Sequence, residues 1–427
     1  MVSSNSAGSG RIDRRKLLKL TAGSVGALAM PGVLRAQAAP IRIGHQQDMT
    51  GFLSFYGFAF DKGARAAVER INSQGGIAGR KVEYLLEDTE SDVANGVRKF
   101  RKLVESDKAD FVLGATHSGT NLATNPIAKE LKTIVFPQGE ASATTGEKAN
   151  RYVFRIRAHS AIQGQAAVAH AVKSIGKKWS FIVTDYAYGH SFYDELAPMV
   201  KAAGGTVLDK IAVPVQSQDM IPFLVRVPRD TEVLFAVFTS ADGIRYLRQG
   251  HEIGLAKRVA RLGPWGMIDG ISLKGIEAAV DNAYFLSHAP RWLDQVPAEV
   301  RDYTAAARKL MGIADDGTVI GANDRIIATS YYLAPWHAIY LLKQAIEKSG
   351  WSSKQDNLKL IEAMEGFNGK ASLDFPMSDF VMRSEDHQAF QNLWIEQVKG
   401  GKLEVVASVP KEQLFFPSKI DLRKESI

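Results

Sequence analysis

Residues 48–92 decide the fold, and they read DMTGFLSFYGFAFDKGARAAVERINSQGGIAGRKVEYLLEDTESD. A short apolar run precedes them, as expected for a first β-strand. Thr50-Gly51 and Tyr56-Gly57 are then expected to turn the backbone off that strand, where a side chain would crowd a ligand. The turn therefore marks one end of the strand as a binding edge.

The rest of this stretch predicts a helix followed by a second strand. Apolar residues at helical spacing give the helix one buried face: Ala64, Ala67, Val68 and Ile71. Gly75 and Gly76 allow the left-handed conformation that ends a helix, and residues 81–86 form the next strand. A strand, glycine-bearing turn, helix and strand build a parallel sheet whose loop faces a binding cleft.

The same stretch carries a family resemblance. It contains Thr50-Gly51, Gly57, a helix that ends in the pattern Asn-x-x-Gly-Gly-Ile-x-Gly-Arg at residues 72–80, and a strand that ends in Asp88. This pattern resembles the periplasmic leucine/isoleucine/valine-binding proteins, the solute receptors of branched-chain-amino-acid-type ABC importers. The resemblance covers nearly all of the chain after Pro40. It implies an α/β type I periplasmic-binding-protein fold, with two parallel-sheet lobes joined by a three-segment hinge.

The remaining sequence repeats the strand–helix alternation in two sets. Strand-like runs occur at 111–114 and 133–136, and the pattern starts again at 180–183, 206–213, 233–236 and 259–262. Two such sets predict two lobes. Helical patterns dominate residues 297–366, and two late strands, 392–398 and 403–409, meet at a Gly-Gly turn.

The resemblance places the three lobe crossings near Arg157, Pro290 and Met377. Lobe 1 is therefore predicted to comprise residues 41–157 plus 290–377. Lobe 2 is predicted to comprise residues 158–289 plus 378–427. Residues 1–38 are predicted to be an export signal.

Composition excludes several classes of protein. The chain has 427 residues and no cysteine, which rules out disulfides, cysteine metal sites and a lipid-anchored lipoprotein. Residues 1–40 hold six Lys/Arg and one Asp, so the net charge of +7 for the chain falls to +2 beyond them. A nearly neutral mature chain does not predict a nucleic-acid partner.

The N-terminal residues read as a cleavable signal. Residues 14–19 are RRKLLK, residues 20–30 are weakly apolar, and residues 36–38 are AQA, a small-residue cleavage site near Ala38. The paired arginines resemble the twin-arginine type. The alternative is an N-terminal membrane anchor, but the apolar run is shorter than the ~20 residues that span a bilayer. We therefore expect a periplasmic mature chain without stable membrane insertion.

The first candidate ligand contact is the turn from Thr116 to Thr120. It lies between a strand and a helix, so its backbone N–H groups and the helix dipole attract carboxylates. In the resembling family a serine at this point holds the carboxylate of the ligand, and Ser118 and Gly119 match it. The alternative is an ordinary N-cap that satisfies the same donors within the protein.

The loop at residues 139–142 is the second candidate. The family uses backbone groups and a threonine hydroxyl here, which implies Gly139, Ala141 and Ser142 as contacts. Ala141 stands at the place of the threonine, so the hydroxyl contact is shifted to Ser142 or lost. Glu140 faces either the solvent or the ligand.

Aromatic residues in glycine turns are the third candidates. Phe55 and Tyr56 are expected to line one wall of the cleft and Tyr188 the opposite wall, because the family commonly has an aromatic before the glycine at this point. Tyr186 is expected to pack at the lobe surface. Turn aromatics lie off any periodic core face, which favours a binding role.

The most informative departure from the family is Trp265. It lies in the turn at residues 263–266, GPWG, where amino-acid-binding relatives carry a glutamate that pairs with the ammonium group. A buried ammonium without a carboxylate is costly, so Trp265 favours an aromatic carboxylate, a short amide or a urea-type compound. The alternative is that Trp265 packs inward and that Asp242 or Asp269 supplies the acid. Phe238 and Thr239 are further candidates at the preceding strand end.

No catalytic constellation occurs in the sequence. It contains no HExxH motif, no metal-ligand spacing and no Gly-x-Ser-x-Gly elbow. The glycine-rich residues 75–81 precede a strand, whereas a phosphate loop follows one. We therefore expect no enzyme activity, no metal and no cofactor.

These observations predict a two-lobed receptor that closes around a small amino acid, amide or aromatic carboxylate. Binding must favour the closed state, because a ligand with equal affinity for the open and closed states does not change their populations. The resemblance implies the membrane subunits of an ABC permease as partners. The alternative is a binding protein that reports its ligand to a membrane signalling partner.

Overall fold

A computed structural model describes residues 1–3, 39–268, 273–322, 326 and 329–426. The chain divides into a short unit, Met1–Ala39, and a compact unit, Pro40–Ile427. The export-signal prediction for residues 1–38 lies outside the described residues, apart from 1–3. Among the described residues, no helix is long and apolar enough to cross a membrane.

A four-stranded parallel sheet forms the centre of the first lobe. Its spatial order is β2 (Val82–Asp88), β1 (Ile41–Gln47), β3 (Phe111–Leu113), β4 (Ile134–Phe136). Alternate strand residues point to opposite faces, as the pleat requires: Phe111 joins one core cluster and Val112 another. The first cluster lies under α2 (Ser54–Ser73) and α12 (Thr329–Ser349), and the second lies under α3 (Val93–Arg101) and α4 (Ser118–Glu130).

A seven-stranded mixed sheet forms the second lobe. Its spatial order is β14 (Lys402–Val409), β13 (Leu393–Lys399), β9 (Tyr284–Ser287), β8 (Ala260–Pro264), β7 (Val233–Val237), β5 (Lys178–Thr184), β6 (Thr206–Val213). Among these described strands, β13 pairs antiparallel with both β9 and β14, and the other neighbouring strands pair parallel.

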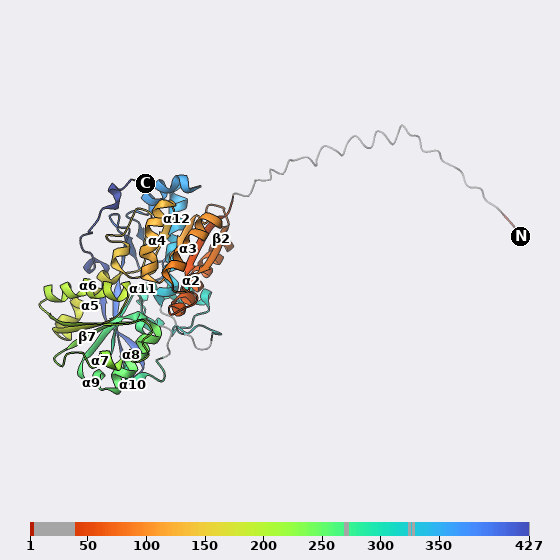
Figure 1. Cartoon of the computed structure of the whole chain (residues 1–427). Coiled ribbons are helices and arrows are strands. Elements are labelled where there is room, and N and C mark those ends of the chain that lie inside the picture. The colour runs from red at the N-terminus through yellow and green to blue at the C-terminus, as the bar shows by residue number, and fades with distance from the viewer. Residues whose placement is uncertain (4–38, 269–272, 323–325, 327–328, 427) are drawn as a thin grey trace. The chain divides into compact units, whose positions relative to one another are not determined.

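Helices cover both faces of the seven-stranded sheet (Figure 1). One face carries α5 (Ser160–Ser174) and α6 (Ala187–Ala202). The other carries α7 (Ile221–Leu224), α8 (Ser240–Glu252), α9 (Leu255–Arg258) and α10 (Glu277–Val280). Phe181 of β5 belongs to the core cluster under α5 and α6, and its neighbour Ile182 belongs to the cluster on the other face of the sheet.

The remaining elements join the lobes. Helices α11 (Ala298–Met311) and α13 (Asn357–Met364) flank α12, and β10 (Asn368–Gly369), β11 (Phe380–Met382) and β12 (Ala389–Gln391) form a small antiparallel sheet. The chain passes from one large sheet to the other after β4, back after β9, and again before β13. The two-lobed α/β architecture predicted from the sequence is confirmed.

One expectation for residues 48–92 is wrong. Gly51 has φ +81° and makes the predicted turn, but Tyr56 and Gly57 lie inside α2. A Cβ at Gly57 would lie 2.1 Å from the carbonyl oxygen of Asp48. Gly57 is therefore required for close packing of the helix on the preceding loop, and not for a turn.

The end of the chain leaves the predicted second lobe. Residues 378–427 were assigned there, yet the carboxylate of Glu425 accepts a hydrogen bond from the backbone N–H of Arg151 at 2.9 Å. Glu425 also pairs with Lys129 of α4. Both partners belong to the lobe of the four-stranded sheet.

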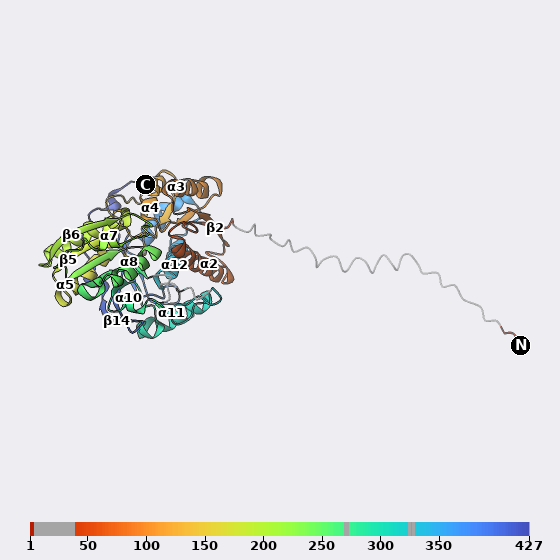
Figure 2. The same cartoon turned by 60° about the horizontal axis from the view of Figure 1, so that its bottom comes forward.

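The packing of α2 on α12 predicts a severe effect of Gly63→Ala (Figures 1 and 2). A Cβ at Gly63 would lie 1.8 Å from the carbonyl oxygen of Tyr332. Since overpacking a core costs about 1–3 kcal/mol or more, we expect the free energy of unfolding to fall by at least that amount in urea denaturation.

The matched control is Gly250→Ala in α8, where the nearest atom to a Cβ lies 3.6 Å away. Alanine is the better helix former by about 0.5–1 kcal/mol, so this variant should be neutral or slightly stabilised. Equal losses in both variants would contradict the packing argument.

Candidate ligand-binding site

Six loops at the carboxyl ends of strands surround a small cavity between the lobes. They follow β1, β3 and β4 in the first lobe and β5, β7 and β8 in the second. Ligands bind at this edge of parallel sheets because the loops there converge. The described lining residues are Leu53, Tyr56, Thr116, Gly139, Glu140, Arg157, Tyr186, Tyr188, Thr239, Gly266 and Tyr331.

Three helices from both lobes begin at the cavity wall. The lining residues Leu53, Tyr186 and Thr239 are the N-cap residues of α2, α6 and α8. Among the described atoms, none of these three side chains accepts a hydrogen bond from its own helix. The positive ends of the three helix dipoles lie at the cavity wall. In α2 the N–H groups of Ser54 and Tyr56 donate to the carbonyl oxygens of Gly51 and Leu53, and in α8 the N–H of Asp242 donates to that of Thr239. The cavity therefore favours an anionic group.

The protein itself occupies the start of α4. The backbone N–H groups of Thr116 and His117 donate to Oδ2 of the fully buried Asp48 at 2.9 and 3.0 Å. Burial raises the pKa of Asp48, and its hydrogen bonds from Thr89, His117 and Thr116 oppose that rise.

Of the contacts predicted in this turn, some line the cavity and others pack against the protein. Thr116 lines the cavity, but the described lining does not include Ser118 or Gly119. The buried Ser118 hydroxyl accepts a hydrogen bond from the N–H of Ala141 at 3.4 Å. A Cβ at Gly119 would lie 2.9 Å from the imidazole of His117, so this position is packed against protein.

Glu140 and Arg157 form a buried ion pair in the cavity wall. Glu140 also accepts a hydrogen bond from Gln163 Nε2 at 2.9 Å, and Arg157 donates to the carbonyl oxygen of Gln138 at 2.8 Å. Burial lowers the pKa of Arg157, but the charge of Glu140 and the neighbouring Tyr331 and Tyr188 together outweigh burial, so the pKa rises on balance. Glu140 is thus neither solvated nor a free carboxylate.

Tyrosines form most of the remaining surface. Tyr56 and Tyr188 are predicted contacts, Tyr186 is expected only to pack, and the sequence gives no signal for Tyr331. Burial raises the pKa of Tyr186 and Tyr188 well above the ordinary value, so both phenols stay neutral donors. Tyr331 lies on α12, far along the chain, and its ring packs under the guanidinium of Arg157 at 4.4 Å.

Several predicted residues lie outside the described lining. Phe55 packs edge-on against Tyr56 with ring centres 5.9 Å apart, and Phe238 packs against Tyr246 at 5.3 Å. The carbonyl oxygen of Ala141 accepts a hydrogen bond from Arg155 at 2.8 Å. Gly139 and Thr239 do line the cavity, as their loop positions suggested.

Trp265 points into the second lobe. Its indole N–H donates to Oε2 of the buried Glu396 at 2.6 Å, and the guanidinium of Arg291 lies 4.5 Å from its ring centre. The described lining does not include Trp265, so its side chain takes the inward alternative. Asp242 pairs with Arg245 at 2.7 Å, and Asp269 lies outside the described residues.

Hydrogen bonds between described residues join the lobes beside the cavity. The Tyr56 hydroxyl of α2 donates to the carbonyl oxygen of Gly266 at 2.6 Å. Ser142, which was predicted as a ligand contact, instead crosses to α6. Its N–H donates to Ser191 Oγ at 2.9 Å, and its hydroxyl donates to Glu195 Oε1 at 2.6 Å. The structure therefore has the lobes closed upon each other.

Arg157, Tyr186, Gly266 and Tyr331 are lining residues that sequence reasoning missed or assigned other roles. Arg157 carried a usable signal, because a second arginine lies only two residues after Arg155 in an apolar segment. Tyr331 carried none, since it lies in the middle of a helical pattern.

A two-lobed α/β chain with a cavity between its lobes has the architecture of a small-molecule binding protein. Residues 40–402 match the family model described as "Periplasmic binding protein". The chain belongs to this family, and the resemblance to its branched-chain-amino-acid type is confirmed.

Named relatives are also binding proteins. The Leu/Ile/Val-binding protein BraC3 of Rhizobium johnstonii is 27% identical over 345 residues, which cover 78% of this chain and 85% of the relative.

Two solved structures share the fold, and both come from Rhodopseudomonas palustris. One is a solute-binding protein of an ABC transporter with 3,4-dihydroxybenzoic acid, 22% identical with TM-score 0.73, covering 87% of this chain and 98% of that chain. The other is a solute-binding protein of an ABC transporter with benzoate, 21% identical with TM-score 0.73, covering 87% and 97%. The predicted type I periplasmic-binding-protein fold is confirmed.

The buried contact between Trp265 and Glu396 predicts a pH-dependent loss of stability in Trp265→Phe. Burial raises the pKa of Glu396, and the Trp265 N–H opposes that rise. Without this donor, the ionised carboxylate is disfavoured further, which costs about 1–3 kcal/mol. The loss should be full at pH 7, where the unfolded chain is ionised, and smaller near pH 4, where Glu396 is largely protonated in both states. Urea denaturation at both pH values measures it.

Trp292→Phe is the matched control, because the buried Trp292 N–H has no acceptor among the described atoms. This variant should show no pH dependence. Losses that are equal in both variants and independent of pH would refute the Trp265–Glu396 assignment.

Proposed function

We propose that this chain is the periplasmic solute receptor of an ABC importer and that it binds a small aromatic carboxylate in the interlobe cavity. The observation that carries the proposal is the pairing of Glu140 with Arg157. They are the two charged residues among the described lining residues, and they neutralise each other. An α-amino acid would bring an ammonium group with no free carboxylate to receive it, which is costly in a buried site.

The remaining wall suits an aromatic acid. The start of α6, where Tyr186 lines the cavity, supplies the positive end of a helix dipole for a carboxylate. The rings of Tyr56, Tyr186, Tyr188 and Tyr331 supply flat apolar surface with hydroxyl groups at the edge. The benzoate and dihydroxybenzoic acid held by the two fold neighbours support the same class.

Closure of the two lobes around the ligand is the proposed binding mechanism. Lobe 1 contributes Tyr56 and the Arg157–Glu140 pair, and lobe 2 contributes Tyr186 and Tyr188 when the lobes meet. Because the wall comes from both lobes, the ligand contacts all of it only in the closed state, so binding shifts the population toward closure. The closed receptor would then deliver the ligand to the permease, and residues 1–38 would direct export.

The ligand class is tested by titration calorimetry and thermal shift on the chain without residues 1–38. Benzoate and 4-hydroxybenzoate should stabilise it by about 2.7 kcal/mol at a hundredfold excess over Kd. Benzamide keeps the ring and removes the charge, so it should bind at least about tenfold more weakly, since charge-assisted hydrogen bonds contribute about 1.5–3 kcal/mol. Leucine should bind no better than benzamide.

Strong stabilisation by leucine, isoleucine or valine and none by benzoate would overturn the aromatic class. Uptake of labelled benzoate by cells with and without the gene tests transport separately. Unchanged uptake alongside tight binding would favour a sensing role.

The contact between Tyr56 and Gly266 predicts weaker binding in Tyr56→Phe. The variant keeps the ring and loses the hydrogen bond that crosses between the lobes, which contributes about 0.5–1.5 kcal/mol. We expect the Kd for benzoate to rise about two- to tenfold, mainly through faster dissociation in stopped-flow measurements. Tyr303→Phe, at a half-exposed position of α11, should leave Kd unchanged. An unaltered Kd in Tyr56→Phe would argue against this hydrogen bond as a closure contact.

A further inference from the structure

Residues 411–425, called the C-terminal strap below, connect the two lobes a fourth time. At the start of the strap, Leu414 is fully buried in the core of the seven-stranded lobe, and the carbonyl oxygen of Gln413 accepts a hydrogen bond from Gln165 of α5 at 3.2 Å. At its end, Glu425 binds Lys129 and Arg151 of the first lobe. Figure 1 shows the C-terminus beside the lobe that carries α4.

The middle of the strap is attached along its length. The guanidinium of Arg383 donates to the carbonyl oxygen of Phe416 and lies 5.1 Å from its ring centre. The N–H of Leu422 donates to the carbonyl oxygen of Glu385 at 2.7 Å. Both partners lie in the connection between β11 and β12, next to a lobe crossing. The strap therefore follows the hinge and is not a loose tail.

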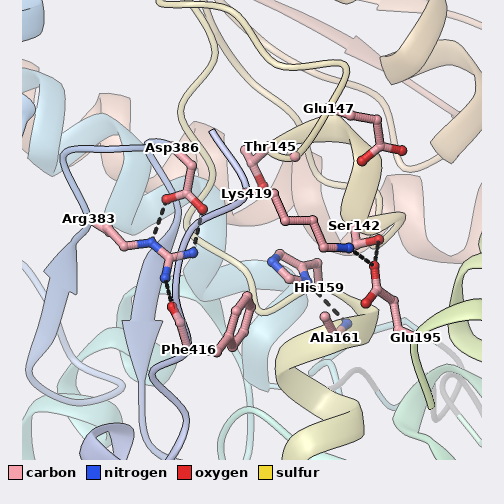
Figure 3. Close-up of a pocket in the computed structure, with 11 residues that line it drawn as sticks. Ser142, Thr145, Glu147, His159, Ala161, Glu195, Arg383, Asp386, Phe416 and Lys419 are labelled. Atoms are coloured by element: carbon pink, nitrogen blue, oxygen red, sulfur yellow. Dashed lines mark hydrogen bonds and ion pairs between the residues drawn. The ribbon is translucent and has the colours of Figure 1, made fainter. Parts of the chain in front are cut away.

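Glu195 of α6 joins the strap to both lobes. Its carboxylate accepts a hydrogen bond from the Ser142 hydroxyl of the first lobe at 2.6 Å and pairs with Lys419 of the strap at 3.3 Å. Figure 3 shows Lys419 and Ser142 meeting at this carboxylate, beside the pocket walled by Phe416 and His159. Ser142, Glu195 and Lys419 do not belong to the described lining of the ligand cavity.

We propose that the C-terminal strap is a brace that holds the lobes closed and thereby raises ligand affinity without touching the ligand. Opening moves Ser142 away from α6, and it pulls the ends of the strap, anchored on different lobes, apart. Contacts that exist only in the closed state lower its free energy, so the closed population grows. The effect on affinity rests on the proposed function, whereas the effect on lobe opening does not.

Single-molecule FRET on the chain without residues 1–38 tests the brace in the absence of any ligand. The chain has no cysteine, so Glu69→Cys on α2 and Arg248→Cys on α8, both at exposed positions, place one label on each lobe. The test variant combines Lys419→Met and Glu425→Gln, which remove both ion pairs and keep the length of the strap and its buried Leu414. The control is Lys424→Ala, whose side chain is 81% exposed.

We expect the open population to rise about three- to tenfold in the double variant and to stay unchanged in the control, in keeping with the modest strength of exposed ion pairs. Thermal melting should differ little between the two, because neither variant touches a core. Identical distance distributions in all three proteins would overturn the brace.

The effect of the strap on ligand affinity is measured with benzoate as the ligand. The Kd should rise by about the same factor as the open population, with the order of preference among benzoate, 4-hydroxybenzoate and benzamide unchanged. A shift in the FRET distribution with no benzoate binding in any variant would uphold the brace and refute the ligand class. A changed order of preference would show that the strap acts on the cavity itself, and this would overturn the proposal.

Discussion

The parallel strand is the constraint on which this structure depends. When strands run side by side in one direction, their carboxyl ends lie on one edge, and each is followed by the start of a helix. In this chain that edge of each large sheet faces the other lobe. Residues as far apart as Leu53, Thr116, Tyr186 and Thr239 therefore meet around one cavity. Their shared property is position at a strand end, and the chemistry of the cavity follows from it.

Charged side chains at this edge of the sheets are paired with other groups of the protein. The buried Asp48 takes the N–H donors at the start of α4, so that helix is satisfied within the protein. Arg157 and Glu140 neutralise each other in the cavity wall. The start of α6 at Tyr186 then contributes the positive end of a helix dipole to the cavity wall. A preference for anions arises here from the dipole of a helix, and not from a dedicated cation.

Much of the fold was predictable because it depends on local patterns. Apolar spacing located the helices, Gly75 and Gly76 marked a helix end, and runs of β-branched residues located the strands. The binding loops were predictable for the same reason, since they follow the strands. Side-chain direction was not predictable. Trp265 and Ser142 lie in the expected loops, but Trp265 turns toward Glu396 and Ser142 crosses to α6, because partners distant in sequence receive them.

The sequence by itself determined the α/β class, the two sets of strand–helix units, the family and the loops that form the cleft, because periodicity and glycine positions act over a few residues. Only the tertiary structure decided which residues face the cavity. Tyr331 reaches it from a long helix, and Arg157 is neutralised by a glutamate that no short-range pattern pairs with it. The path of the C-terminal strap was decided in the same way. Burial, ion pairing and contact between the lobes depend on residues that come together only after folding. A local sequence pattern therefore does not identify the individual contacts.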